Sequence, residues 1–237
     1  MSKKIFISIA TYNESENIEK LIRDIFSLNI EFLSIIIIDD NSPDGTGKIV
    51  ENLKQEFPNL CLISRSGKLG YGSAHVAGFK KAMENQAEIV ISMDADFSHD
   101  PKVIPKLIEA IGEGVDVAIG SRRVPGGEMV GWSLRRKFCS VGAMITSQII
   151  LGIKTHDLTS GFRAYNVEVL KKINIDDIKS DGYSFLEELI YQIEKNKFKI
   201  KEMPIVFYDR RLGHSKLSRK EIIKFFLTII RIKFSKK

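Results

Sequence analysis

The sequence predicts an α/β protein with a mainly parallel central sheet flanked by helices. Short apolar runs, often β-branched, alternate with segments that have the apolar periodicity of helices. Polar or glycine-rich stretches follow several of these runs, as expected where strands end at the carboxyl edge of a sheet. This alternation is typical of βαβ units, in which a helix connects two parallel strands.

Four strands and their intervening helices are expected in the first half of the chain. The β-branched run Ile35–Ile38 indicates a strand that is buried on both faces. Apolar residues at helical spacing indicate helices after Ser15, through Ile49 to Leu53, and over about Ser73 to Asn85. The four expected strands are Ile5–Ala10, Ile35–Ile38, Leu60–Ile63 and Ile89–Met93.

The regular alternation ends after a fifth expected strand, Val115–Gly120. Beyond it the pattern predicts mostly helices and loops, followed by one more strand at Ile200–Phe207. The expected loops are Ser121–Gly131, Thr155–Tyr165 and Tyr208–Lys216. The expected helices are Leu134–Leu151, Val167–Ile173, Phe185–Asn196 and Ser218 to about Ser235. No repeat or low-complexity linker divides the chain, so residues 1–237 are interpreted as one domain.

Composition restricts the function classes. The 237 residues are 43% hydrophobic and 28% charged, which is enough apolar material for a sizeable core. A net charge of +6 favours anionic partners such as phosphates, nucleic acid or an anionic membrane surface. Because basic and aromatic residues do not cluster along one face, we expect no nucleic-acid binding.

No targeting segment or membrane-spanning helix is expected. The apolar stretch after Lys4 is too short for a signal peptide, and no run reaches the roughly 18 apolar residues of a span. Cys61 and Cys139 lack the spacing of a metal site, so we expect free thiols in a reducing compartment.

The triplet Asp94-Ala95-Asp96 is the strongest chemical signal, because it follows an expected strand directly. Two neighbouring carboxylates repel each other unless a proton or cation intervenes. A hard divalent cation such as Mg²⁺ or Mn²⁺ suits carboxylate ligands and commonly binds a diphosphate as well. The alternative is that both aspartates only cap the following helix. Tyr12 and either Asp39 or Asp40 follow other strands and are expected at the same sheet edge.

Two common nucleotide motifs are absent. The chain contains no G-x-x-x-x-G-K-[ST] phosphate loop. The turn after the first expected strand, Thr11-Tyr12-Asn13-Glu14, has none of the glycines of a dinucleotide fingerprint. Hydride transfer is therefore disfavoured.

Several motifs together resemble family 2 glycosyltransferases of the GT-A fold. Those that carry the resemblance are Ala10-Thr11-Tyr12-Asn13-Glu14, Asp39-Asp40-Asn41-Ser42-Pro43-Asp44-Gly45-Thr46 and Asp94-Ala95-Asp96. Further motifs resemble the dolichol- and polyprenol-phosphate mannose synthases of this family. They are Gly120-Ser121-Arg122, Gly131-Trp132-Ser133-Leu134-Arg135-Arg136-Lys137, Asp157-Leu158-Thr159-Ser160-Gly161-Phe162-Arg163 and Asp209-Arg210-Arg211-Leu212-Gly213-His214-Ser215-Lys216. The chain departs from the pattern at Ala10, where the family usually has Pro, and at Ser98, where some relatives have a metal-binding Gln.

The resemblance implies an inverting hexosyltransferase that favours GDP-mannose as donor and the phosphate of a polyprenyl (dolichyl) phosphate as acceptor. It implies a divalent metal, Mg²⁺ or Mn²⁺, on Asp94 and Asp96. It also implies a nucleotide-sugar half over about residues 1–120, an acceptor half over about 121–217, and a C-terminal amphipathic helix over 218–237. The implied nucleotide-sugar site comprises Ala10, Tyr12, Glu14, Asp39, Asp40, Lys68, Asp94, Ala95, Asp96 and Arg210. Lys68 is equally compatible with a solvated position.

The acceptor side needs cations rather than a base. A phosphomonoester is mostly dianionic at neutral pH, so it can attack without losing a proton to the protein. The implied phosphate ligands are Arg122, Arg136, Arg210 and Lys216, and the implied catalytic residues are Asp96, Arg122 and Arg136. Surface or capping positions are expected for His75, His99, His156 and His214.

The last expected helix indicates a membrane surface. It begins with the capping box Ser218-Arg219-Lys220-Glu221, and its apolar residues cover roughly 220° of its circumference. Since packing on a core needs an arc of only about 100°, a second apolar neighbour is expected, namely lipid, a partner helix or another copy. Basic residues on the remaining arc favour an anionic membrane. We therefore expect a peripheral protein on the cytoplasmic face of a membrane; a wide core helix is the alternative.

Other functions remain compatible with the sequence. A same-fold enzyme with another donor, such as UDP-glucose, would carry similar motifs. A non-catalytic nucleotide-binding protein is a second alternative, although the presence of Asp94, Asp96, Arg122 and Arg136 disfavours it. The sequence leaves open the lipid length, the oligomeric state and a partner membrane subunit.

Overall fold

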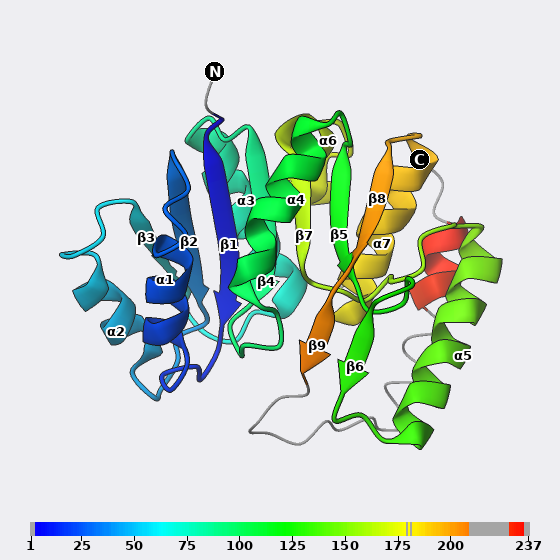
Figure 1. Ribbon diagram of the computed structural model, residues 1–237, viewed down its shortest axis with the longest axis horizontal. Helices are drawn as coiled ribbons and strands as arrows, with labels where there is room; N and C mark the ends of the chain where they lie inside the picture. Colours follow the sequence, from blue (N-terminus) through cyan, green and yellow to red (C-terminus); the bar gives the residue numbers. More distant parts are fainter. Residues whose placement is uncertain (1–2, 179, 181, 209–227, 235–237) are drawn as a thin grey trace.

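A mixed, mainly parallel sheet forms the centre of the molecule (Figure 1). The computed structural model describes residues 3–178, 180, 182–208 and 228–234. Seven strands lie in the order β3-β2-β1-β4-β7-β5-β8. They are β1 (Ile5–Thr11), β2 (Leu33–Asp39), β3 (Leu60–Ser64), β4 (Ile89–Asp94), β5 (Val117–Ser121), β7 (Arg163–Asn166) and β8 (Ile200–Pro204). All adjacent pairs are parallel except those involving β7, which confirms the predicted fold class.

Helices cover both faces of the sheet (Figure 1). Ile35 and Ile37 of β2 pack into one core cluster, with apolar residues of α1, α2 and α4. Ile36 and Ile38 pack into the other, with residues of α3, α6 and α7. The isoleucine run is thus buried on both faces, as predicted. The helices are α1 (Ile18–Phe26), α2 (Thr46–Leu53), α3 (Tyr71–Glu84), α4 (Ile104–Gly112), α5 (Leu134–Leu151), α6 (Val167–Lys172) and α7 (Tyr183–Lys195), with single 3₁₀ turns at Pro101–Val103 and Ile175–Asp177.

The long helix α5 has the bounds that the sequence predicts. Ser133 caps its start, where its Oγ accepts a hydrogen bond from the Arg136 N–H at 3.3 Å. Gly152 ends it with a φ of 72°, the left-handed conformation that glycine adopts without a steric penalty. These two signals fix the position of α5 along the chain.

Strand β7 was not predicted, because residues 155–165 were expected to be mostly loop. It lies between β4 and β5 and is antiparallel to both. Its first residue, Arg163, is fully buried, and its guanidinium donates to the carbonyls of Leu158 (2.7 Å) and Leu186 (3.0 Å). A buried arginine interrupts the apolar pattern by which a strand is recognised, and only the folded chain supplies its carbonyl partners.

The predicted strand over residues 200–207 is in fact two strands. β8 ends at Pro204, and β9 (Val206–Tyr208) pairs in parallel with β6 (Glu128–Val130), which was expected to be loop. Ile205 connects them: its N–H donates to Ser121 O, and its carbonyl accepts from Glu128 N–H, both at 3.0 Å. Three-residue strands such as β6 have no periodicity long enough to detect from sequence.

The last predicted helix lies partly outside the described residues. Residues 228–234 are helical, and Ile229 and Ile232 are buried in the same core cluster as α7. Ile230 and Phe234 are exposed. This segment lies beside the end of α5 (Figure 1), where Lys233 Nζ donates to the Leu151 carbonyl at 3.5 Å. The described part therefore combines a core face with an exposed apolar face.

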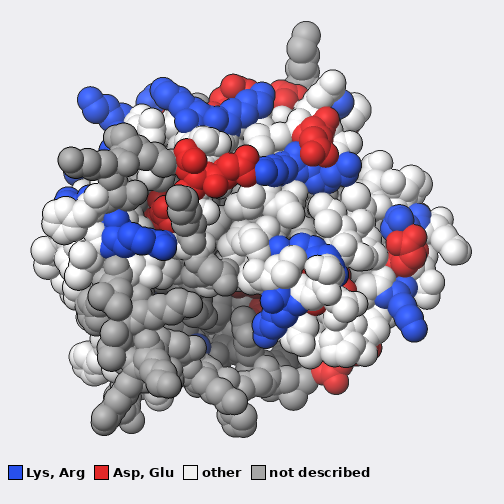
Figure 2. Space-filling view, turned by 180° about the vertical axis from the view of Figure 1, so that it is seen from behind, with Lys and Arg blue, Asp and Glu red and all other residues white. Residues whose placement is uncertain are grey.

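Positive and negative side chains intermingle on the face opposite to that of Figure 1, as Figure 2 shows. Ion pairs of α3 and α6 include Lys80 with Asp176 and Lys171 with Glu168. None of the helices in the described part of the chain combines the length and hydropathy that crossing a bilayer requires.

Candidate active site

The carboxyl ends of β1, β2 and β4 meet at one edge of the sheet. The strand register pairs Ala10 with Asp94 and Thr11 with Asp39. Tyr12 follows Thr11 directly and lies at the same edge. The predicted gathering of polar side chains after these three strands is therefore confirmed.

Asp39 fixes the turn after β2. Its buried carboxylate accepts hydrogen bonds from Thr11 Oγ1 at 3.0 Å and from the Ser42 N–H at 3.0 Å. The Ser42 hydroxyl also donates to it, at 2.5 Å. Asp39 thus joins β1 to the 39–46 turn, and both of its carboxylate oxygens accept hydrogen bonds from the protein.

Asp40 holds the glycine-rich loop over residues 65–72. It forms an ion pair with Arg65, and its second oxygen accepts from the Leu69 N–H at 3.0 Å. Arg65 in turn donates to the Gly70 carbonyl at 2.9 Å and to Ser73 Oγ at 2.7 Å. Arg65 was not among the predicted site residues, although its place in a basic, glycine-rich loop was a usable signal.

Tyr12 and Lys68 lie against each other at the open side of this edge. Lys68 Nζ is 4.3 Å from the centre of the Tyr12 ring, within the range of a cation–π contact. Glu14 accepts a hydrogen bond from Asn17 Nδ2 at 2.9 Å, and its N–H donates to Thr46 Oγ1 at 2.9 Å. An aromatic ring, a cation and a carboxylate therefore border the space beyond β1 and β2.

Asp94 and Asp96 are both partly exposed, and Ala95 between them is buried. Asp94 ends β4, while Asp96 Oδ1 accepts from the Ser98 N–H at 3.0 Å in a turn where Phe97 has a φ of 57°. The left-handed conformation is uncommon for phenylalanine, and such outliers gather at functional sites.

A divalent cation fits these two carboxylates by its chemistry. Mg²⁺ is commonly bound through one or two carboxylates, with substrate phosphates and water completing its shell. Within the described ranges no cluster of three or more acidic, His or Cys side chains suited to a metal forms here. The Ser98 hydroxyl is buried and has no hydrogen-bond partner in the described part of the chain. The described residues therefore offer a cation two carboxylates rather than a closed cage of ligands.

Tyr71 and Gly161 fit closely around Asp94. The Tyr71 hydroxyl donates to Asp94 Oδ1 at 3.1 Å. A Cβ on Gly161 would lie 2.6 Å from that hydroxyl oxygen and 3.2 Å from Asp94 Oδ1. Only glycine allows this approach, so the chain between α5 and β7 helps to determine where the Asp94 carboxylate lies.

His99 and His75 are buried, which corrects the expected surface or capping positions. His99 Nδ1 accepts the Asp94 N–H at 3.2 Å, and its ring stacks on Phe162 with centres 5.0 Å apart. Burial lowers the pKa of His99 from its ordinary value of 6.5. Burial also lowers the pKa of His75 to about 4, and that ring packs against Tyr71. Both imidazoles are therefore expected to be neutral at physiological pH.

Arg122 lies beyond β5 and is bound within the protein. Its Nε donates to Asp157 Oδ2 at 2.7 Å, and its NH2 group donates to Asp157 Oδ1 at 2.6 Å. NH2 also donates to Thr159 Oγ1 at 2.8 Å. Asp157 belongs to one of the motifs of the sequence analysis, but no role was predicted for it. It is 35 residues away from Arg122 along the chain, so no local sequence pattern indicates that the two side chains pair.

Arg136 lies in the first turn of α5, with its guanidinium carbon 4.0 Å from the centre of the Trp132 ring. The Arg122 guanidinium carbon lies 5.9 Å from the same ring and 5.0 Å from the Phe207 ring. Phe207 also packs edge-on against His99, with centres 5.7 Å apart. A continuous set of ring contacts thus joins the Asp94 side of the site to the two arginines.

Of the other predicted phosphate ligands, Arg210 and Lys216 lie outside the described residues.

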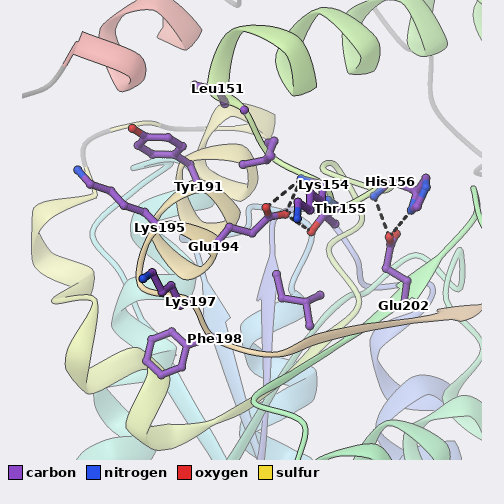
Figure 3. A pocket seen from close by; sticks show the side chains of 13 residues that line it. Leu151, Lys154, Thr155, His156, Tyr191, Glu194, Lys195, Lys197, Phe198 and Glu202 are labelled. Carbon is purple, nitrogen blue, oxygen red and sulfur yellow. Dashed lines mark hydrogen bonds and ion pairs between the residues drawn. The ribbon is translucent and has the colours of Figure 1, made fainter.

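A cavity of about 600 Å³ lies away from these residues, between the end of α5, α7 and the start of β8 (Figure 3). Glu194 accepts hydrogen bonds from the N–H groups of Lys154 and Thr155, at 2.8–3.0 Å. Glu202 accepts from the N–H groups of His156 and Asp157, at 2.8 and 2.9 Å. The two carboxylates therefore fix the segment that carries Asp157, and none of the predicted site residues lines this cavity.

The sheet order, with Asp94 and Asp96 at the carboxyl end of β4, is that of the GT-A fold. One similar solved structure is glucosyl-3-phosphoglycerate synthase from Mycobacterium tuberculosis with Mn²⁺, uridine-diphosphate and glucosyl-3-phosphoglycerate. It has a TM-score of 0.68 and 19% identity, covering 98% of this chain and 79% of that chain. The same synthase with Mg²⁺ and uridine-diphosphate has a TM-score of 0.67 and 18% identity, covering 99% of this chain and 81% of that chain. At this identity the likeness shows the fold.

Residues 6–174 match the family described as Glycosyl transferase family 2. The chain belongs to this family and is a glycosyltransferase. A polyprenol monophosphomannose synthase of Mycolicibacterium smegmatis is 38% identical over 93% of this chain and 83% of its own length. An undecaprenyl-phosphate mannosyltransferase of Micrococcus luteus is 38% identical over 91% of this chain and 88% of its own length. A dolichol-phosphate mannosyltransferase of Pyrococcus furiosus is 39% identical over 97% of this chain, which spans 63% of that protein.

Proposed function

We propose that this glycosyltransferase moves mannose from GDP-mannose to the phosphate of a polyprenyl (dolichyl) phosphate, with inversion at the anomeric carbon. The observation that carries the proposal is that contacts of His99, Phe207 and Trp132 connect Asp94 to Arg122 and Arg136. Carboxylates suit a metal-bound diphosphate, and arginines suit a second phosphate. Relatives named for mannose transfer to polyprenol, undecaprenyl or dolichol phosphates support it further.

The donor half is proposed to bind the nucleotide at the ends of β1 and β2. Tyr12 offers a ring for the base or ribose to pack on, and Lys68 beside it offers a positive charge for the diphosphate. Ala10 and Glu14 border the same space, and Arg210 is proposed as a further ligand from outside the described residues. Asp39 and Asp40 shape the two loops around the nucleotide, because their carboxylates hold Ser42 and Leu69.

A divalent metal, Mg²⁺ or Mn²⁺, is proposed at Asp94 and Asp96. When bound there it would stabilise the negative charge that develops on the departing nucleoside diphosphate. Tyr71 orients the Asp94 carboxylate, and the Ser98 N–H orients that of Asp96.

The acceptor phosphate is proposed to approach Arg122 and Arg136, with Lys216 a further candidate. Arginine forms bidentate contacts with phosphate oxygens and brings the two anions together. Because the acceptor is already a dianion, the chain needs to hold it rather than deprotonate it. Attack on the side of the sugar opposite the diphosphate inverts the anomeric carbon.

A peripheral position on the cytoplasmic face of a membrane is proposed for the lipid acceptor to reach the site. The outer side of α5 exposes a stripe of large apolar side chains at helical spacing, namely Leu134, Phe138, Ile145 and Ile149. Phe234, on the neighbouring C-terminal segment, is also exposed. Such a surface is compatible with a bilayer or with a partner membrane subunit.

One assay tests the proposal directly. The purified protein is incubated with polyprenyl phosphate, Mn²⁺ and a panel of radiolabelled sugar nucleotides, and label is counted in the lipid phase. We expect label from GDP-mannose and little from UDP-glucose. Preference for UDP-glucose would correct the donor, and no transfer from any donor would favour the non-catalytic alternative.

A further inference from the structure

Trp132 lies within cation–π range of both arginines that are proposed to bind the acceptor phosphate. It follows β6 and directly precedes Ser133, the cap of α5. Both guanidinium groups lie over its ring: the carbon of Arg136 is 4.0 Å, and that of Arg122 5.9 Å, from the ring centre. One indole therefore contacts two cations that come from different elements of the fold.

The local sequence explains how Arg136 reaches this ring. Side chains on a helix point back towards its N-terminus, and Arg136 lies in the first turn of α5. Gly131, with a φ of 85°, turns the chain between β6 and Trp132. The turn and the Ser133 cap together set the indole and the guanidinium against each other.

The Trp132 ring also affects the electrostatics of the two guanidinium groups. Two guanidinium groups on one site repel each other, and the repulsion increases where water is excluded. Asp157 compensates the charge of Arg122, and Phe207 packs against the same guanidinium at 5.0 Å. The negative face of an aromatic ring attracts cations, so Trp132 offsets part of the remaining repulsion.

We propose that Trp132 is a positioning residue, which holds Arg136 beside Arg122 so that one acceptor phosphate meets both cations. The inference rests on the proposed function, which assigns the two arginines to that phosphate. It adds that the ring of Trp132, rather than its N–H, does the positioning. The Nε1 atom is buried and has no hydrogen-bond partner in the part of the chain that the structure describes.

Two substitutions of Trp132 distinguish the effect of its aromatic face from the effect of filling the same space. Trp132→Phe removes the pyrrole ring with its unpartnered N–H but keeps a smaller aromatic face, whereas Trp132→Leu removes the aromatic face. With a short water-soluble prenyl phosphate as acceptor, we expect Trp132→Leu to raise the acceptor KM about tenfold or more. We expect Trp132→Phe to stay within about threefold of wild type, and the donor KM to change little in either variant.

The fluorescence of Trp132 gives a readout that does not depend on turnover, because the chain contains a single tryptophan. We expect the emission of the wild-type protein to change and saturate as the prenyl phosphate is added. The matching prenyl alcohol, which lacks the phosphate, should cause no such change. Arg136→Ala should abolish the response. Arg23→Ala, which removes an exposed arginine of α1, is the matched control and should retain it.

The outcomes distinguish this inference from the proposed function. If the wild-type protein transfers mannose but its emission does not respond to the prenyl phosphate, the positioning role is wrong and the function stands. An unchanged acceptor KM in Trp132→Leu would also show that the positioning role is wrong. If Trp132→Leu does not fold, Trp132→Phe provides the test. An acceptor KM that is raised as much in Trp132→Phe as in Arg136→Ala would then refute the role of the ring. Absence of transfer from every donor, with a normal emission response, would instead refute the function while leaving an anion site at Trp132.

Discussion

Asp157 holds the guanidinium of Arg122 through two hydrogen bonds, of 2.6 and 2.7 Å, in the interior of the protein. The Asp157 side chain is fully buried and that of Arg122 is 5% exposed. Asp157 also accepts the Arg122 N–H at 2.9 Å. Arg122, which is proposed to bind the acceptor phosphate, therefore also stabilises the fold.

Asp157→Asn should destabilise the protein as well as slow transfer. Removing one partner of a buried ion pair leaves an uncompensated charge, which typically costs about 3–5 kcal/mol. The free energy of unfolding in urea at pH 7 measures the loss. A loss below about 1 kcal/mol would contradict the structural role of the pair, since surface pairs cost no more than that.

The pair of Asp157 and Arg122 should also make the stability of the protein depend on pH in the acidic range. Burial by itself would raise the pKa of Asp157, but the hydrogen bonds and charge of Arg122 outweigh it and lower the pKa below its ordinary value of 3.8. Its contribution to stability is thus complete above the unfolded-state pKa and is lost as pH falls through the folded-state pKa. Asp157→Asn should remove this part of the acid dependence.

Asp96→Asn should abolish transfer while leaving the fold largely intact. The substitution removes a carboxylate charge from a partly exposed position, so the metal loses a ligand without a core residue being changed. Titration of the protein and nucleoside diphosphate with Mn²⁺, followed by calorimetry or electron paramagnetic resonance, should show weakened metal binding. Asp24→Asn on the exposed side of α1 is the matched control. Activity within about threefold of wild type at ordinary metal concentration would rule out the metal role.

Arg136→Ala should weaken use of the acceptor more than tenfold, a loss above about 1.4 kcal/mol. Nucleotide affinity should change much less, because Arg136 lies on α5 rather than at the ends of β1 and β2. Calorimetry with GDP and kinetics with the acceptor separate the two effects. A fall in nucleotide affinity as large as the fall in turnover would assign Arg136 to the donor side.

Arg122→Ala should also reduce acceptor use more than tenfold, and should in addition lower stability, because Asp157 would lose its partner.

Glu187 should make the protein less stable as the pH rises from mildly acidic to mildly alkaline. Burial raises its pKa from 4.5 to about 8, although Ser147 Oγ donates to it at 3.3 Å. Between the unfolded and folded pKa values the native state holds a proton that the unfolded state lacks. The free energy of unfolding therefore falls by about 1.4 kcal/mol per pH unit in this window. Glu187→Gln should flatten the slope measured by urea denaturation from pH 5 to pH 8, whereas exposed Glu84→Gln should not.

The apolar stripe of α5 should bind anionic vesicles. Phe138 and Ile149 are 75% and 76% exposed, so replacing both with Ser removes apolar contact with lipid without opening the core. Flotation with vesicles at low salt should show binding by wild type and loss in the double variant. Phe32→Ser, which changes an exposed residue directly before β2, is the control and should still float.

Removing residues 218 onward tests the C-terminal part of the proposed membrane surface. It should reduce transfer to a long polyprenyl phosphate more than transfer to a short soluble analogue. Because Ile229 and Ile232 are buried, a folded truncated protein must be established first by circular dichroism. Equal loss of both activities in a folded protein would argue against a membrane role, as would the absence of vesicle binding by wild type at low salt.

The sequence predicts best what depends on neighbouring residues. A cap and a terminal glycine are local signals, and they determine where α5 begins and ends. The β-branched run of β2 indicates burial on both faces because period-two alternation is absent from it. Parallel strands with polar ends also predict that Asp39 and Asp94 meet at one edge, which requires only the general rule for such sheets.

Tertiary structure alone decides what depends on residues that are distant in sequence. The pairing of Arg122 with Asp157, the two cations over Trp132, and the short β6–β9 ribbon all join segments with no local signal for each other. The same reason explains why Arg163 was not expected within a strand and why His75 and His99 are buried. A polar side chain can be buried where the fold supplies partners or packing neighbours, and such partners lie far away along the chain. The sequence alone thus determined the parallel strands β1 to β5, their polar edge and the residue types available for chemistry. Three-dimensional packing determined the place of β7 in the sheet and which of those residues hold one another.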